Sequence, residues 1–240
     1  MKPTIIYEDA DCAVLSKPAG LVVHPDGRTE EPTLSDWVVT RYPEAKGVGE
    51  PIALSNGKMI DKDGIVHRLD RETSGVILVA RNAEAFQFLK KQFQERTIEK
   101  VYRAFVYGEV ARDDGIIDRP IGKSTTDFRR WTAESNTRGV TREAVTVYRN
   151  LLRGGGFTYV EVRPKTGRTH QIRVHMKLIG HPVVCDQLYA SGKASALGFT
   201  RTALHAFTID FTAPSGAHIH AEAPLPPDFE HAVAELEKLC

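Results

Sequence analysis

Two short polar segments carry the residue types that could do chemistry. The first runs from Gly64 to Gly75 and contains His67-Arg68-Leu69-Asp70, between a loop-like stretch and an apolar run. Arg68 and Arg71 flank Asp70, and neighbouring guanidinium groups favour the ionised form of a carboxylate. An ionised carboxylate can act as a nucleophile. The alternative interpretation of the same residues is a solvated loop with a local ion pair.

The second segment runs from Arg163 to His175. Pro164 and Gly167 predict a turn, and the apolar spacing that follows predicts a helix over residues 169–179. His170 and Arg173 are three residues apart, which places them on one helix face. Arginines beside the free N–H groups of a helix start suit a phosphate or a carboxylate. An exposed basic helix face is the alternative.

A third polar stretch, residues 113–142, looks like a long excursion or hairpin. Its arginines are interleaved with Phe128 and Trp131, a mixture that suits phosphate neutralisation and base stacking. Asp127 and Glu134 dilute this pattern, so a solvated hairpin remains the alternative. The basic residues of the stretch are Arg119, Lys123, Arg129, Arg130, Arg138 and Arg142.

Several other chemistries fail on spacing. His170 and His175 are five residues apart, and no His-Glu-x-x-His occurs, which argues against a zinc protease site. The glycines at 154–156 lack the Lys-Ser/Thr of a phosphate loop. No glycine-rich dinucleotide motif opens a helix after a strand. We therefore expect neither a metal nor a nicotinamide or flavin cofactor.

The elements that must position these segments alternate irregularly between strands and helices. Apolar periodicity predicts helices over residues 34–42, 83–96 and 169–179 and after Pro227. Residues 44–64 are rich in Gly, Pro, Asn and Asp and indicate a surface loop. Strands outnumber helices and are joined by short turns, which favours an α+β fold with mostly antiparallel pairing. The expected strands lie near residues 12–15, 75–80, 101–107, 144–148, 157–162, 204–211 and 218–223.

Composition narrows the class of protein. The 240 residues include 32 Lys and Arg against 31 Asp and Glu, so a polycation that coats nucleic acid indiscriminately is excluded, although a local basic surface is not. No apolar run approaches the roughly 20 residues of a membrane span. Cys12, Cys185 and Cys240 are far apart and odd in number, which favours free thiols in a reducing cytoplasm.

Four segments in order resemble the RluA family of RNA pseudouridine synthases. His67-Arg68-Leu69-Asp70 with Thr73-Ser74-Gly75 resembles the family's first signature, and the segment from Gly167 to His175 resembles its second. Lys17-Pro18-Ala19-Gly20 looks like its early strand–turn segment, and Lys100-Val101-Tyr102 looks like its tyrosine strand. Gly180-His181-Pro182 and Asp186 also match, so the resemblance covers nearly the whole chain.

The resemblance implies roles position by position. Asp70 matches the aspartate that attacks the target uridine. Tyr102 matches the tyrosine that packs on the uracil, and Arg173 matches the arginine paired with the aspartate. Arg68 matches an arginine that holds the RNA open around the flipped base. Three further residues are expected to support RNA binding at the site: His67, Arg168 and His170.

The resemblance also implies an architecture and a function. We expect a pseudouridine synthase fold in one catalytic domain over residues 1–240, with two sub-lobes across a central active-site cleft and no N-terminal S4-like domain. The expected activity is cofactor-free isomerisation of uridines in ribosomal or transfer RNA, in the cytoplasm, by a monomer that needs no protein partner. A non-catalytic RNA-binding or RNA-chaperone module on the same fold is the alternative, and a uracil-releasing hydrolase is a third hypothesis.

Overall fold

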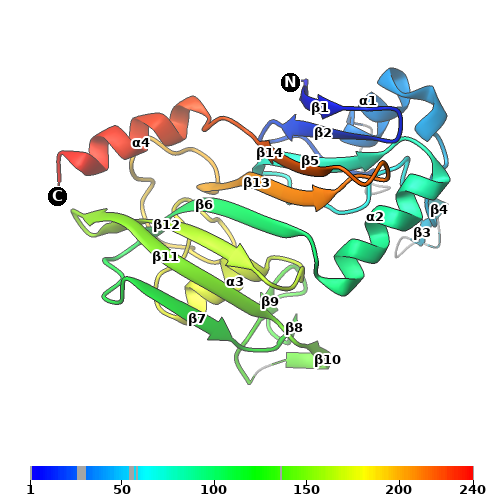
Figure 1. The fold of residues 1–240 in the computed structure, drawn as a ribbon. Coiled ribbons are helices and arrows are strands. Elements are labelled where there is room, and N and C mark those ends of the chain that lie inside the picture. Colours follow the sequence, from blue (N-terminus) through cyan, green and yellow to red (C-terminus); the bar gives the residue numbers. More distant parts are fainter. Residues whose placement is uncertain (1, 26–30, 54–56, 58, 136, 240) are drawn as a thin grey trace. The chain divides into compact units, whose positions relative to one another are not determined.

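The chain divides into two compact units. The computed structural model (Figure 1) describes residues 2–25, 31–53, 57, 59–135 and 137–239. The first unit combines residues 1–99 with residues 206–224, and the second combines residues 100–205 with residues 225–240. The chain therefore passes from one unit to the other three times, and neither unit is one continuous stretch of sequence.

The first unit is built on strands that pair mainly antiparallel, and the apolar runs predict most of them. Its strand order is β1-β2-β5-β13, and β14 pairs with β13. All seven residues of β5 are buried, which explains its uninterrupted apolar sequence. The strands are β1 (Thr4–Glu8), β2 (Cys12–Lys17), β5 (Ser74–Ala80), β13 (Leu204–Thr212) and β14 (His218–Glu222).

Two helices accompany these strands, α1 (Leu34–Arg41) and α2 (Ala83–Glu95). The Asn82 side chain accepts a hydrogen bond from the Ala85 N–H and caps α2, which buries Phe86 and Leu89. Gln92 of α2 exchanges two hydrogen bonds with the backbone of Thr212 in β13. These contacts confirm the helix expected over residues 83–96.

The stretch expected to be a surface loop, residues 44–64, contains short regular elements. These are the 3-10 turn η1 (Pro43–Ala45) and the antiparallel pair β3 (Ile52–Ala53) and β4 (Met59–Ile60). Two-residue strands are too short to show the alternation of apolar side chains that reveals a strand in sequence. The surface-loop prediction therefore omits these short elements.

The second unit is built on strands around a core of its own. Four strands lie side by side in the order β6-β12-β11-β7, every neighbouring pair antiparallel (Figure 1). Phe105 is fully buried and stacks on Tyr159, with ring centroids 4.6 Å apart. The strands are β6 (Glu99–Tyr107), β7 (Asp114–Asp118), β11 (Val145–Gly154) and β12 (Phe157–Pro164). Gly155 and Gly156 take positive φ in the β11–β12 turn, as the glycine run predicts.

Two helices belong to the second unit, α3 (Gln171–Leu178) and α4 (Pro227–Glu237). Ile172 and Met176 of α3 and Phe229 and Leu236 of α4 are buried in the same core as Phe105. The strands and helices together confirm the α+β class and the mostly antiparallel pairing.

The polar stretch 113–142 supplies β7 and a separate three-stranded sheet, here called the small sheet. It consists of β8 (Ile121–Ser124), β9 (Trp131–Thr132) and β10 (Thr137–Arg142), antiparallel in the order β10-β8-β9. A second, smaller core lies between the small sheet and α3. Its buried members are Ile121, Ala144, Val174 and Tyr189, with Trp131, Ala133 and Leu188 packed against them.

Candidate active site

Asp70 lies in a tight turn between two anchored segments of the first unit. The Asp70 carbonyl accepts a hydrogen bond from the Thr73 N–H at 3.1 Å, and Leu69 is buried. Gly75, where β5 continues after Ser74, has a φ of +111°, and a Cβ there would collide with the backbone of Ala206 in β13. Only glycine fits this position. The sequence of the loop thus holds a half-buried carboxylate on a rigid support.

Lys17 fixes the other side of this turn. Its ammonium group is fully buried and donates hydrogen bonds to the carbonyls of Pro18, Leu21 and Arg71, at 2.9, 2.8 and 3.0 Å. The Gly20 N–H also donates to the Arg71 carbonyl, at 2.9 Å. Three carbonyl dipoles offset the desolvation of the cation. The early strand–turn segment therefore holds the chain next to Asp70 in place.

His67 is bonded to the strand that follows its own loop. Its Nε2 accepts a hydrogen bond from the Leu78 N–H at 2.9 Å, and its ring lies 4.8 Å from the ring of Phe93. An accepting Nε2 carries no proton, so this contact belongs to the neutral ring. The observed role of His67 is to join the loop to β5 and α2, and its expected role in RNA binding stays a prediction.

The two arginines that flank Asp70 differ in their surroundings. Arg71 forms a bidentate ion pair with Glu31, at 2.8 and 2.9 Å, whereas Arg68 is exposed. Burial, followed by the nearby charge of Arg68, lowers the pKa of His24 to about 4, and the opposite effect of Asp63 is smaller. Arg68 is exposed, and its charge is near enough to His24 to affect the pKa of that ring.

The second signature segment takes a different local structure from the one its spacing predicts. His170 has a φ of 56° and is the N-cap of α3, so the helix begins at Gln171, two residues later than predicted. His170 and Arg173 therefore do not share one helix face. Gln171, Arg173 and His175 are buried, so an exposed basic helix face is also wrong. A left-handed residue at a helix start has no periodic signal in sequence.

Arg173 is held by a buried carboxylate. Its Nε and Nη2 lie 2.5 and 2.8 Å from the two carboxylate oxygens of Asp186, which is 1 % exposed. Asp186 also accepts hydrogen bonds from the N–H groups of Leu188 and Tyr189. This planar, bidentate arrangement fixes the direction of the guanidinium.

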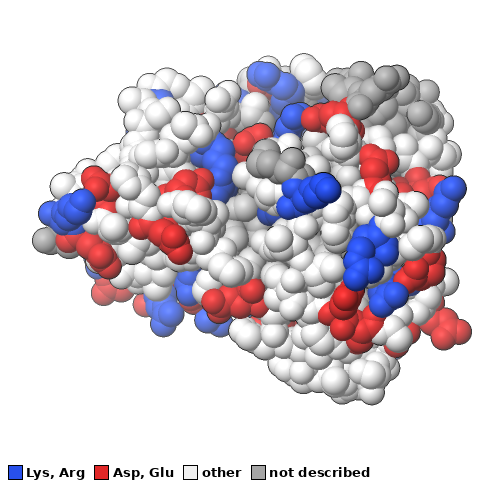
Figure 2. All heavy atoms as spheres, turned by 90° about the horizontal axis from the view of Figure 1, so that it is seen from above, with Lys and Arg blue, Asp and Glu red and all other residues white. Residues whose placement is uncertain are grey.

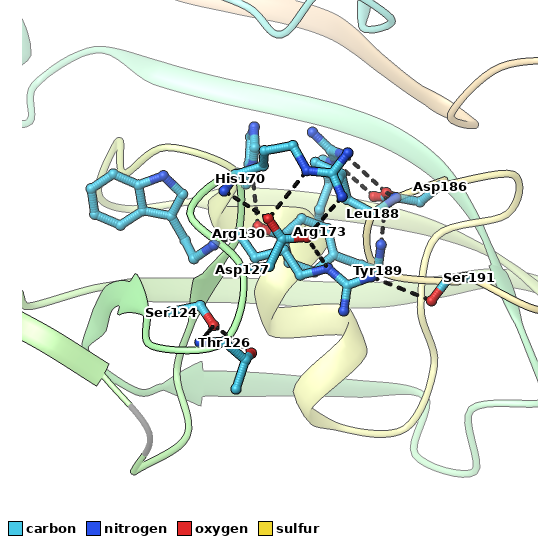
Figure 3. A network of polar contacts seen from close by, with 12 residues as sticks. Ser124, Thr126, Asp127, Arg130, His170, Arg173, Asp186, Leu188, Tyr189 and Ser191 are labelled. Atoms are coloured by element: carbon cyan, nitrogen blue, oxygen red, sulfur yellow. Dashed lines mark hydrogen bonds and ion pairs between the residues drawn. The ribbon is translucent and has the colours of Figure 1, made fainter. Parts of the chain in front are cut away.

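The rest of this network joins α3 to the small sheet (Figure 3). The Tyr189 hydroxyl accepts a hydrogen bond from the Trp131 N–H and lies 2.9 Å from Nδ1 of His170. The Arg173 guanidinium lies 5.1 Å from the centre of the Tyr189 ring. Arg130 reaches Ser191 at 3.4 Å. Sequence analysis missed Tyr189 because it is a lone aromatic residue in an irregular loop.

Tyr102 and Arg168 lie on other elements of the second unit. Tyr102 is half-buried on β6, and Lys100 precedes it by two residues, so both side chains point to the same side of the strand. Burial lowers the pKa of Lys100 to about 8, a signal that the sequence does not show. The Arg168 side chain donates to the Glu143 carbonyl at 2.9 Å, beside the end of β10.

His175 and His181 have structural partners. His175 is fully buried between the Thr146 hydroxyl and the Arg119 carbonyl, each at 2.9 Å, and burial lowers its pKa. His181 lies 2.9 Å from the Tyr107 carbonyl, as expected for a structural histidine. Cys12 and Cys185 are free thiols, and Cys240 lies outside the described residues.

The expected site residues fall in both compact units. His67, Arg68 and Asp70 belong to the first unit, whereas Tyr102, Arg168, His170 and Arg173 belong to the second. Within each unit the residues lie on segments that hydrogen bonds and buried neighbours fix. The pairing of Asp70 with Arg173 that the resemblance implies stays a prediction.

Charge is mixed on the surface. Lys and Arg are interspersed with Asp and Glu over the face drawn in Figure 2, in keeping with the net charge of +1. In the described part of the chain, no helix has the length and apolar character that a membrane crossing requires. The same part contains no cluster of three His, Cys, Asp or Glu side chains that could hold a metal ion.

Residues 11–178 match the family model described as RNA pseudouridylate synthase, a stretch that includes both signature segments. The chain belongs to this family. Its relatives include an uncharacterized RNA pseudouridine synthase of Bacillus subtilis, 39% identical over 98% of this chain and 73% of the relative. The ribosomal large subunit pseudouridine synthase D of Xanthomonas campestris is 37% identical over 98% of this chain and 69% of its own length.

Solved structures agree with this membership. The human RNA pseudouridylate synthase domain containing 1 superposes with a TM-score of 0.74 at 26% identity, over 94% of this chain and 84% of that one. The human protein named RNA pseudouridylate synthase domain containing 4 has a TM-score of 0.75 at 24% identity and shows the shared fold. The synthase described here is thus an isomerase with the pseudouridine synthase fold, as its sequence predicts.

Proposed function

We propose that this synthase isomerises specific uridines of ribosomal RNA to pseudouridine in the cytoplasm. The choice of ribosomal RNA rests on the names of several relatives. These proteins, 34–38% identical to this chain, are named ribosomal large subunit pseudouridine synthase D. Transfer RNA remains the second candidate, because the near-neutral charge of the chain also suits a compact stem-loop. We propose that the chain acts as a monomeric catalytic domain without a protein partner.

In the proposed reaction, Asp70 attacks the target nucleotide. The bond between N1 of uracil and the sugar breaks and the base turns. A new bond forms between C5 and the same sugar carbon, and the bond between Asp70 and the nucleotide breaks again, which releases the carboxylate. The proton on C5 is lost and N1 gains one, so the atoms balance without an oxidant or a metal. Arg173 keeps the carboxylate ionised and directed at the nucleotide, while Tyr102 packs against the extruded base.

Three further residues are proposed to bind the RNA, and a fourth, His67, to support the site. Arg68 is exposed and can stack in the space that the flipped base leaves. Arg168 and His170 lie at the start of α3, next to the small sheet, whose arginines would contact phosphates. His67 supports the loop of Asp70 from behind, through its bond to β5.

The test is tritium release from RNA labelled at C5 of uracil. The RNA comes from a strain that lacks this enzyme, and ribosomal and transfer RNA are assayed separately. We expect wild type to release tritium from ribosomal RNA, and Asp70→Asn to release none while it still binds RNA. Asp61→Asn is the matched control, because Asp61 is an exposed carboxylate in the same unit.

Each other outcome contradicts a defined part of the proposal. Tritium release by Asp70→Asn would show that Asp70 is not the residue that attacks the nucleotide. Release from transfer RNA alone would exclude the ribosomal substrate. Free uracil in the products would indicate a hydrolase. RNA binding by wild type without release from either RNA would favour the non-catalytic alternative.

A further inference from the structure

Tyr189 contacts three parts of the second unit at once. Its hydroxyl accepts the Trp131 N–H of β9 at 2.9 Å and lies 2.9 Å from Nδ1 of His170, the N-cap of α3. Its ring packs edge-to-face with the ring of His170 and lies beneath the guanidinium of Arg173. The side chain is 6 % exposed, so these contacts are shielded from water.

The hydrogen bonds of this hydroxyl are complementary. A tyrosine hydroxyl has one proton to donate and can accept two hydrogen bonds. Because Trp131 donates to it, the hydroxyl proton is available for Nδ1 of His170. One oxygen atom therefore connects the backbone of the small sheet with the start of α3.

The small sheet packs on α3 through a small core in which Tyr189 is one of four buried side chains. A second link joins Arg130, beside β9, to Ser191, two residues beyond Tyr189. Val174 of α3 belongs to the same core and adjoins Arg173 in sequence. A displacement of the small sheet would therefore reach the ring of Tyr189 directly.

Arg173 is fixed on one side and stacked on the other. Asp186 holds Nε and Nη2 of the guanidinium, and the backbone N–H of Tyr189 donates to the same carboxylate at 3.0 Å. The tyrosine thus contacts the guanidinium through its ring and the partner carboxylate through its backbone.

We propose that Tyr189 is a positioning residue that transmits the position of the small sheet to Arg173. The inference rests on the proposed function, because it takes the small sheet as an RNA contact and Arg173 as part of the active site. RNA that seats correctly on the small sheet fixes Trp131, and through Tyr189 it fixes the guanidinium. The enzyme would then select its RNA through the rate of the reaction as well as through affinity.

The first experiment compares Tyr189→Phe with Tyr107→Phe in single-turnover tritium release. Tyr107 is a matched control, since its buried hydroxyl also has two partners, the Ala194 carbonyl and the Cys185 N–H, away from the small sheet. We expect Tyr189→Phe, which removes the contacts of the hydroxyl with Trp131 and His170, to lower the rate at saturating RNA by about fivefold, with little change in the RNA dissociation constant. Tyr107→Phe should leave the rate within about twofold of wild type.

A double-mutant cycle tests the transmission itself. Arg129→Ala removes an exposed arginine beside the small sheet and should slow the reaction of wild type. In the Tyr189→Phe background the same change should have a smaller effect on rate, whereas in the Tyr107→Phe background its effect should be undiminished. Independent effects of Arg129→Ala and Tyr189→Phe would overturn the proposal.

A measurement that needs no turnover separates this inference from the proposed function. The Nε–H resonance of Arg173, assigned with Arg173→Lys, should shift when ribosomal RNA fragments bind, and the shift should be lost in Tyr189→Phe but kept in Tyr107→Phe. A shift that survives in Tyr189→Phe overturns the inference even in an active synthase. Absence of tritium release by wild type overturns the proposed function, and the resonance then still decides whether Tyr189 transmits RNA binding.

Discussion

At the scale of single residues, the buried ion pair of Arg173 and Asp186 carries the clearest energetic consequence. A buried charge is tolerated when its partner and further hydrogen bonds satisfy it, and Asp186 meets this condition with two backbone N–H groups besides the guanidinium. The ion pair therefore fixes the orientation of the Arg173 guanidinium, and it adds little net stability to the fold.

Loss of one partner of this ion pair should destabilise the folded protein. We expect Asp186→Asn to lower the free energy of unfolding by about 3–5 kcal/mol, because it removes the buried carboxylate charge that faces both Nε and Nη2 of the guanidinium. Urea denaturation checks this, with Glu235→Gln as the control, since the ion pair of Glu235 with Lys238 is exposed and should contribute little. Equal midpoints for the two variants would contradict the expectation.

His24 provides a pH dependence of known sign. Its pKa of about 4 in the folded chain lies below the usual value of 6.5, mainly because of burial. As the pH falls from 6.5 towards 4, the unfolded chain binds a proton that the folded chain does not, so folding becomes less stable.

Urea denaturation at several pH values between 7 and 4 should show this loss in wild type. The variant His24→Phe should lose less stability over the same range, because its unfolding takes up at most one proton fewer per molecule. His175, whose pKa burial also lowers, keeps its own contribution to the pH dependence in both proteins. Identical pH dependence in the two proteins would show that His24 takes up its proton equally in both states.

Sequence alone identifies residues with recognisable neighbours and misses those that act through tertiary contacts. Asp70 and Arg173 stand in signatures whose residue types already suggest chemistry. Tyr189 has no such context, because its partners come from residues 131, 170 and 173 and meet only in the fold. The low pKa of Lys100 likewise follows from burial, and the sequence of a strand does not show that a lysine in it is buried.

At the scale of elements, the small sheet combines a thin core with many cations. Phe128 is 72 % exposed in the loop between β8 and β9, and Asp127 is half-buried and paired with Arg129. An exposed aromatic side chain among arginines suits stacking on an unpaired base. The cations of the small sheet and its β8–β9 loop are Lys123, Arg129, Arg130, Arg138 and Arg142.

These cations should make RNA binding depend on salt. Each phosphate contact contributes about −0.7 to the slope of log affinity against log salt for single-stranded RNA. We expect the double variant Arg138→Ala/Arg142→Ala to make the slope less steep by about 1.4, measured by fluorescence anisotropy between about 50 and 200 mM salt. Lys91→Ala, in an exposed helical pair with Glu95, should leave the slope unchanged.

Element boundaries show where periodicity works. The strand β5 and the helix α2 have long patterns bounded by Gly75 and Asn82, and sequence places both within a residue or two. The start of α3 was misplaced because a left-handed His170 interrupts it, and β3 and β4 were missed because two residues show no period.

At the scale of the whole molecule, the C-terminal helix closes the core of the second unit. Phe229, Ala232 and Leu236 are fully buried. Truncation of one large buried side chain costs about 2–5 kcal/mol, and whole domains are stable by about 5–15 kcal/mol. A chain that ends after Pro224 should therefore lose its cooperative thermal transition in circular dichroism, whereas a chain that ends after Glu237 should keep it. A cooperative melt without α4 would show that the core tolerates the loss.

The three passages between the units also set an order of events during synthesis on the ribosome. β5 has its neighbour β13 only after residues 100–205 have been made, because β13 belongs almost entirely to the returning segment 206–224. At about 5–20 residues per second, this delay is on the order of 5–20 s. During that time the start of β5, where Gly75 meets Ala206 in the folded chain, lacks its neighbour, and incompletely paired edges promote aggregation. The nascent chain of this synthase should therefore depend on chaperones that bind apolar strands during its synthesis, more than a protein whose units are contiguous in sequence.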